Sequence, residues 1–134
     1  MLAELWGRFL RNVPGFSVIT GYKPIDHQLE IGLLTDKGLI RAVNQDNIGV
    51  FQSPDSHDCI AVVADGMGGH QAGDIASLTA IETIQQNYID FLDKRAPDKA
   101  LRQVFELANR VIFTQAQQNP EYHGMGTKYF FLLL

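Results

Sequence analysis

The sequence predicts an α/β sandwich of the α+β type, in which helices cover a β-sheet. Short apolar segments separated by polar turns lie between residues 29 and 64, and two long segments with helical periodicity follow them. The 134 residues are 46% hydrophobic and 19% charged, which is typical of a globular domain that buries a core.

The N-terminal segment differs from the rest. Met1–Val13 places leucine, phenylalanine and tryptophan at helical spacing, with two arginines on the other side. We expect a short helix that packs on the domain; an interfacial membrane anchor is the alternative, for which two arginines are few. Pro14–His27 mixes proline, glycine and polar residues and predicts a linker. We therefore assign residues 1–28 to an extension and linker, and residues 29–134 to the domain.

Five elements are expected within this domain. Apolar runs between turns predict strands at Leu29–Thr35, Asn47–Phe51 and Cys59–Ala64. Apolar residues at helical spacing predict one helix over Ala72–Leu92 and a second over Pro97–Gln115. The stripes on these two helices are expected to form the core of the domain.

The most informative segment is the run Val-Ala-Asp-Gly-Met-Gly-Gly-His-Gln-Ala-Gly at Val63–Gly73. An apolar strand ends at Asp65, a glycine-rich turn follows, and the turn leads into the first long helix. Glycine lets the backbone approach an ion or a phosphate closely, and a carboxylate at the end of a buried strand is usually paired or metal-bound. The alternative is that Asp65 only caps the helix.

Composition excludes some partners. A net charge of −4 with no lysine or arginine cluster argues against nucleic-acid binding. No apolar stretch reaches the length of about 20 residues that a membrane span needs. The single cysteine, Cys59, is expected to be a buried structural thiol in a reducing compartment, which favours a cytoplasmic location.

Four segments carry a family resemblance. Thr35–Asp46 contains an arginine followed by Asn-Gln-Asp, Val63–Gly73 contains the glycine turn, and Gly73–Ser77 and Gly124–Thr127 follow in order. Together they resemble the bacterial form of the metal-dependent serine/threonine protein phosphatases of type 2C, the PPM family, over the N-terminal half of its domain. The resemblance implies a partial type 2C fold, with antiparallel strands covered by two long antiparallel helices.

The resemblance also implies a binuclear Mn²⁺ or Mg²⁺ site. Asp65 matches the family residue that bridges the two metals, Gly66 the residue that ligates through its main-chain oxygen, and Asp46 the other N-terminal acidic position. Such hard cations prefer oxygen ligands. An Asx-type turn with Asn44 and Asn47 is a second interpretation of Asp46, and both can hold.

Two further residues are candidates for contact with substrate. Arg41 matches the phosphate-binding arginine of the family, and its planar guanidinium suits a phosphate dianion. The alternative for Arg41 is a surface side chain or an ion-pair partner. His70 is a candidate proton donor to the leaving oxygen, or a residue that orients the loop. Animal members place a histidine directly after Asp-Gly, where this chain has Met67.

The resemblance implies a cytoplasmic phosphatase that hydrolyses phosphoserine and phosphothreonine in proteins and opposes a serine/threonine kinase. The family completes its metal site with aspartates from its C-terminal half, and those contexts are missing after Thr127. The chain departs from the family at Lys128–Leu134, an apolar run. The alternative function is therefore a truncated, inactive remnant that binds a metal or a phosphorylated partner, and we expect little turnover by these 134 residues alone.

Overall fold

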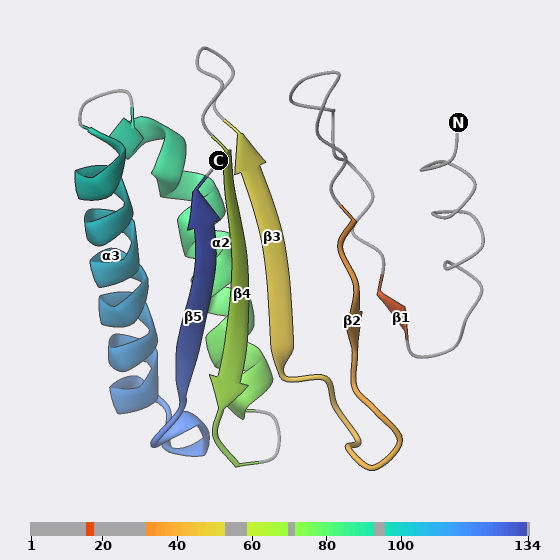
Figure 1. The fold of residues 1–134 in the computed structure, drawn as a ribbon. Helices are drawn as coiled ribbons and strands as arrows, with labels where there is room; N and C mark the ends of the chain where they lie inside the picture. Colours follow the sequence, from red (N-terminus) through yellow and green to blue (C-terminus); the bar gives the residue numbers. More distant parts are fainter. Residues whose placement is uncertain (1–15, 18–31, 53–58, 70–71, 93–95, 134) are drawn as a thin grey trace.

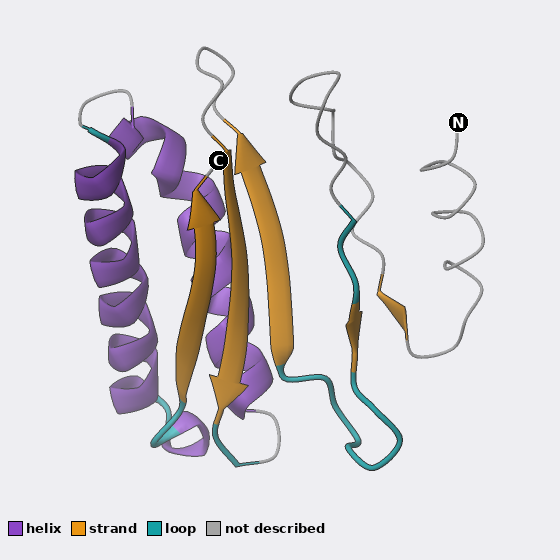
Figure 2. Ribbon diagram, in the orientation of Figure 1, coloured by secondary structure: helices purple, strands orange, loops and turns teal. Residues whose placement is uncertain are grey.

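Two long helices cover one face of a three-stranded antiparallel sheet in the computed structural model (Figures 1 and 2). The structure describes residues 16–17, 32–52, 59–69, 72–92 and 96–133. The sheet has the order β3-β4-β5, with strands at Asp46–Gln52, Cys59–Met67 and Gly126–Leu133. The helices are α2 (Ala72–Leu92) and α3 (Pro97–Gln118), and a short 3-10 helix, η1 (Pro120–Tyr122), leads from α3 into β5.

The central strand β4 separates the two faces of the sheet. Successive side chains of a strand point to opposite faces, and on β4 the even-numbered residues Ile60, Val62 and Ala64 are buried in the core. The odd-numbered residues Val63 and Asp65 therefore point to the face away from the helices. We call this second face the open face.

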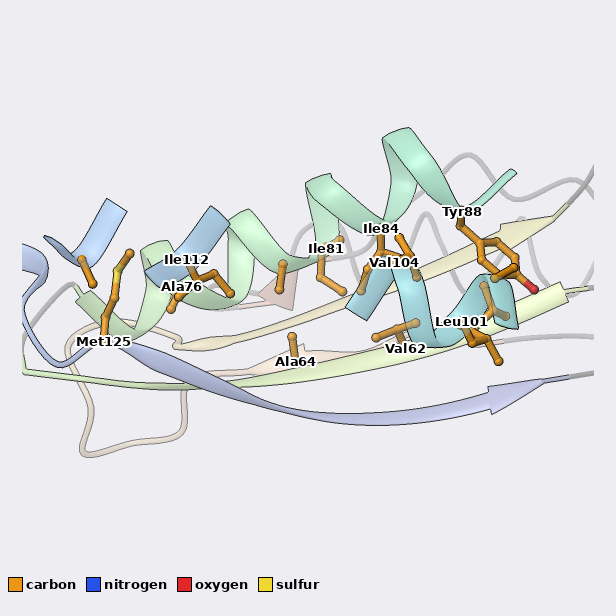
Figure 3. Close-up of a cluster of buried hydrophobic side chains, with 14 of the residues drawn as sticks. Val62, Ala64, Ala76, Ile81, Ile84, Tyr88, Leu101, Val104, Ile112 and Met125 are labelled. Atoms are coloured by element: carbon orange, nitrogen blue, oxygen red, sulfur yellow. The ribbon is translucent and has the colours of Figure 1, made fainter. Parts of the chain in front are cut away.

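The core lies between β4 and the two helices (Figure 3). Helix α2 carries a row of buried alanines that allows close approach to the sheet. Its Ile84 lies beside Val104 of α3, and its Tyr88 lies beside Leu101 of α3, in the core (Figure 3). The helices run antiparallel in Figure 1. Thr79 Oγ1 of α2 donates a hydrogen bond to Gln115 Oε1 of α3 at 3.1 Å. Helix α3 begins at Pro97, where the absent proline N–H costs no helical hydrogen bond.

The edge strand β5 joins the core through its aromatic residues. The ring centroid of Phe105 on α3 lies 4.9 Å from that of Tyr129 and 5.1 Å from that of Phe131. Residues on the opposite side of β5 are exposed on the open face, including Phe130 and Leu132. The sheet is thus apolar on both faces, and only one face is covered by the described helices.

The predicted α+β fold and most of its elements are confirmed. The first helix has the predicted bounds, the second extends to Gln118, and two strands run slightly longer than predicted. Cys59 is buried, and burial raises the pKa of its thiol, as expected for a structural cysteine. The strand predicted at Leu29–Thr35 is wrong over residues 32–34, which belong to no strand; β2 is only Thr35–Asp36, and residues 29–31 lie outside the described residues. Strand β2 ends because Asp36 Oδ1 accepts a hydrogen bond from Gly38 N at 2.6 Å, which begins a turn.

Little of the predicted N-terminal extension is described. Phe16–Ser17 forms β1, which pairs antiparallel with β2 and lies within the segment predicted as a linker. The helix predicted at Met1–Val13 lies outside the described residues, and the domain boundary at residues 28/29 stays a prediction. Among the described helices, none is long and apolar enough to cross a membrane.

Tyr129 provides a test of the packing between β5 and α3. Its hydroxyl is buried and has no hydrogen-bond partner in the described part of the chain. An unsatisfied buried hydroxyl costs free energy, so Tyr129→Phe should leave the free energy of unfolding at pH 7 unchanged or raise it by up to about 1 kcal/mol. Urea denaturation of both proteins measures the difference.

The pH dependence of the same pair of proteins gives a second readout. Burial raises the pKa of Tyr129 to about 12 in the folded protein, from near 10 in an unfolded chain. Folding disfavours the ionised form of this hydroxyl, so stability is independent of its titration below pH 10 and decreases as the pH rises from 10 through 12. Wild-type protein should lose stability over this window more steeply than Tyr129→Phe. Parallel curves for the two proteins would contradict the burial of this hydroxyl.

Candidate functional site

Asp46 and Asp65 lie directly opposite each other on neighbouring strands. In the antiparallel β3–β4 pair their Cα atoms are register partners. The next rung is hydrogen-bonded, because Gly66 N donates to Gln45 O at 3.0 Å. Hydrogen-bonded and non-hydrogen-bonded rungs alternate, so the two aspartates form a non-hydrogen-bonded pair, the type in which Cα atoms are about 4.5 Å apart. The sequence indicated two acidic residues near one site, and the structure brings them to one rung.

Both carboxylates point to the open face. Asp65 alternates with the buried Ala64, and Asp46 precedes Asn47, whose Nδ2 donates to Ser77 Oγ of α2 at 2.9 Å on the helix side. Both aspartates are partly buried. Like charges directly opposite each other across a sheet are destabilising, so the pair is suited to a cation that neutralises it.

The Asn-Gln-Asp triplet positions Asp46 from its N-terminal side. Asn44 Oδ1 accepts a hydrogen bond from Asp46 N at 3.1 Å, which confirms the predicted Asx-type turn. Asn44 Nδ2 also donates to Thr35 Oγ1 at 2.8 Å and so ties this turn to β2. The side chain of Asn47, expected in the same turn, instead contacts Ser77. The turn and the acidic site coexist.

Gln45 joins three elements through its main-chain oxygen. That oxygen accepts hydrogen bonds from Gly66 N at 3.0 Å and from Ser77 Oγ at 2.6 Å. Its side-chain Nε2 lies 3.4 Å from the carbonyl oxygen of Gly68 in the glycine turn. Gln45 and Ser77 were not predicted as organising residues from the sequence. The small Ser77 on the inner face of α2, otherwise lined by alanine, is the signal that could have revealed the second of them.

Gly66 is buried where three segments meet. A Cβ atom at this position would lie 2.5 Å from Gln45 O and even closer to the carbonyl oxygen of Gly73 in the first turn of α2. The absence of a side chain is therefore required for packing, whatever else the residue does. The predicted role of the Gly66 carbonyl as a metal ligand stays a prediction.

The other two predicted site residues are Arg41 and His70, of which only Arg41 lies within the described residues. Arg41 is exposed in the turn between β2 and β3, and among the described residues no hydrogen bond or ion pair joins it to either aspartate. The turn beside it is open, since Leu39 and Ile40 are almost fully exposed. His70 lies outside the described residues.

Lys128 is a charged neighbour of Asp65 that was not predicted from the sequence. It is the register partner of Asp65 on β5. Thr127 Oγ1 donates to the main-chain oxygen of Asp65 at 3.0 Å and secures that register. Sequence alone gave no signal for this neighbour, because strand pairing decides which residue faces Asp65.

The described residues fit part of a metal site. Two carboxylates on one rung supply the oxygen ligands that Mg²⁺ and Mn²⁺ prefer. Within the described ranges, no group of three or more His, Cys, Asp or Glu side chains gathers in one place. These residues can therefore supply two side-chain ligands, and water or other groups would complete the coordination of an ion.

Comparison with known proteins identifies the family. The sequence model described as "Protein phosphatase 2C" matches residues 41–127, which include the carboxylate pair and the glycine turn. This chain belongs to the protein phosphatase 2C family. Members of this family are generally metal-dependent, which agrees with a cation-binding role for the pair.

Bacterial phosphatases are among the relatives of this phosphatase 2C chain. It is 38% identical over 96 residues to the serine/threonine phosphatase stp of Listeria monocytogenes, covering 69% of this chain and 38% of the relative. It is 37% identical over 103 residues to the protein phosphatase PhpP of Streptococcus pneumoniae, covering 74% and 40%. The chain thus spans about two fifths of the length of these relatives.

The fold is also shared with solved phosphatases. The serine/threonine phosphatase Stp1 of Staphylococcus aureus superposes with a TM-score of 0.63 at 30% identity, covering 74% of this chain and 39% of that one. The phosphatase PstP/Ppp of Mycobacterium tuberculosis gives 0.58 at 31% identity, with 74% and 39% covered. The sheet and helices described above therefore follow the phosphatase 2C fold.

The close packing around Gly66 predicts a large effect of a small substitution. Gly66→Ala places a methyl group against two backbone carbonyls that cannot move independently, and should lower the free energy of unfolding by about 1–3 kcal/mol. Gly69→Ala is the matched control, because a Cβ there meets nothing within 4 Å, and should change stability by less than about 0.5 kcal/mol. Urea denaturation measures both. Equal effects would show that the contact between the glycine turn and Gln45 is loose.

Proposed function

We propose that this chain supplies the N-terminal part of the active site of a metal-dependent serine/threonine protein phosphatase, which hydrolyses phosphomonoesters on proteins. Family membership and the names of the relatives support this function. The observation that carries it is the register of Asp46 with Asp65, which gathers two carboxylates on one face of the sheet at the glycine turn.

The cation in this proposal is Mn²⁺ or Mg²⁺, bound by Asp46 and Asp65 with the carbonyl of Gly66 as a further ligand. Divalent cations would activate water and neutralise charge on the phosphoryl oxygens. The chain's own contribution is to hold the two carboxylates in fixed positions before a cation arrives. The Asx-type turn at Asn44 and the hydrogen bonds to Gln45 O support this role.

Arg41 is proposed to bind the phosphate of the substrate. Its guanidinium can donate two parallel hydrogen bonds to a phosphate, and its exposed turn leaves it accessible. The Asx-type turn at Asn44 joins the segment that carries Arg41 to the start of β3. Arg41 is therefore close in sequence to Asp46. His70, next to the glycine turn in sequence, is proposed as a proton donor or as a residue that orients the turn.

The proposed substrates are phosphoserine and phosphothreonine in cytoplasmic proteins, with a serine/threonine kinase as the opposing enzyme. The names of the relatives support the substrate class. The net charge of −4 supports a protein that binds neither nucleic acid nor an anionic membrane surface.

A second candidate function is binding of a metal or of a phosphorylated partner without turnover. The number of acidic ligands favours it, because two carboxylates offset only half of the charge of two divalent cations. Among the described residues no third acidic side chain joins the pair. The two candidates share the carboxylate pair and differ in turnover.

The metal assignment predicts a specific loss of binding. Asp65→Asn keeps the shape of the side chain and removes its charge, so Mn²⁺ affinity measured by isothermal titration calorimetry should fall at least about tenfold, the scale expected for one nearby charge. Asp98→Asn is the matched control, because Asp98 lies in the first turn of α3, which packs on the other side of the sheet. Equal Mn²⁺ affinities for Asp65→Asn and wild-type protein would show that this pair does not bind the metal.

Turnover distinguishes the two candidate functions. We expect the 134-residue chain to show little Mn²⁺-dependent hydrolysis of a phosphothreonine peptide, and the same residues fused to the remaining part of the Listeria relative to show robust hydrolysis. Within the fusion, Arg41→Ala should raise KM and leave the Mn²⁺ requirement unchanged, as expected for loss of uniform phosphate binding. A fusion that folds, binds Mn²⁺ and does not hydrolyse the peptide would favour binding without turnover.

A further inference from the structure

Three strands place a row of three charges on the open face of the sheet. Asp65 on β4 has Asp46 as its register partner on β3 and Lys128 as its register partner on β5. The hydrogen bond from Thr127 Oγ1 to Asp65 O, 3.0 Å long, secures the second pairing. The row therefore reads acid, acid, base across the sheet, with Asp65 in the middle.

The lysine lies on the same face as the two acids. Its neighbour Tyr129 packs against Phe105 of α3, so Tyr129 faces the helices and Lys128 faces the open side. Cβ atoms of directly opposite residues are about 4.5–5.5 Å apart. Lys128 is exposed, and its flexible side chain has room to bring the ammonium group over the carboxylates.

A positive charge in this place has two consequences. In the metal-free protein it offsets the repulsion between two carboxylates that face each other across a rung. For an incoming divalent cation it is a repulsive neighbour that has to move aside or share the same carboxylate oxygens. The two effects act in the same direction, since both favour the metal-free state over the metal-bound state.

We propose that Lys128 acts as a tethered counter-cation of the Asp46–Asp65 pair, stabilising the pair without metal and lowering its affinity for divalent cations. The inference rests on the proposed metal-binding function of the pair. It gives this chain an affinity-setting residue on the strand next to the site. Because Lys128 is exposed to water, the effect is moderate and depends on salt.

The test compares Mn²⁺ affinities of the 134-residue protein by isothermal titration calorimetry. Lys128→Gln should bind Mn²⁺ about three- to tenfold more tightly than wild-type protein at low salt, and the difference should shrink at 1 M salt, where the Debye length is about 3 Å. Lys128→Arg keeps the charge and should match wild-type protein. Lys99→Gln is the matched control, because it removes the same charge from the exposed first turn of α3.

Equal Mn²⁺ affinities for wild-type protein and Lys128→Gln, or an equal gain in Lys99→Gln, would overturn the proposal. A second readout needs no metal: thermal stability without Mn²⁺ should fall in Lys128→Gln and should fall less when Asp65→Asn is present in both proteins. An equal fall in the two backgrounds contradicts the proposal. Failure of the proposed function is distinguishable, since Asp65→Asn would then leave Mn²⁺ binding unchanged.

Discussion

The carbonyl oxygen of Gln45 is the point at which the strands, the glycine turn and the first helix meet. It accepts hydrogen bonds from Gly66 N and from Ser77 Oγ. The first bond fixes β3 against the end of β4, and the second fixes both strands against α2. A slip of one residue in this register would move Asp46 to the helix side of the sheet, because side chains alternate between faces. The position of the carboxylate pair thus depends on this one acceptor.

The same constraint explains the glycines of the turn. Gly66 packs so closely against the main chain of Gly73 and Gln45 that a Cβ on Gly66 would overlap both, and a Cβ on Gly73 would make a tight contact with the Gln45 side chain. Close packing brings the start of α2 against the end of β4, so the chain reverses within a few residues of Asp65. The glycine turn that suggested an ion-binding loop in the sequence is therefore also a packing device, and the two roles are compatible.

The sequence predicted the elements better than their pairing. Helix α2 was predicted with its observed bounds because a long apolar stripe is a strong local signal. Strand β2 was misplaced because its extent depends on pairing with a two-residue partner and on the turn at Gly38. The neighbours of Asp65 on β3 and β5 depend on register, which a single sequence does not show. The role of Gln45 was not predicted because every residue type has a main-chain oxygen, so the sequence does not show which one accepts these hydrogen bonds.

The arrangement of the site depends on β3 and β4 pairing with Asp46 opposite Asp65 as a non-hydrogen-bonded rung. Nuclear Overhauser contacts between Hα atoms measure this pairing directly, because Cα atoms approach most closely in such rungs. We expect strong Hα–Hα contacts between Asp46 and Asp65 and between Ile48 and Val63. Strong contacts from Asp46 to Ala64 or Gly66 would contradict this pairing, since either register would separate the two carboxylates onto opposite faces of the sheet.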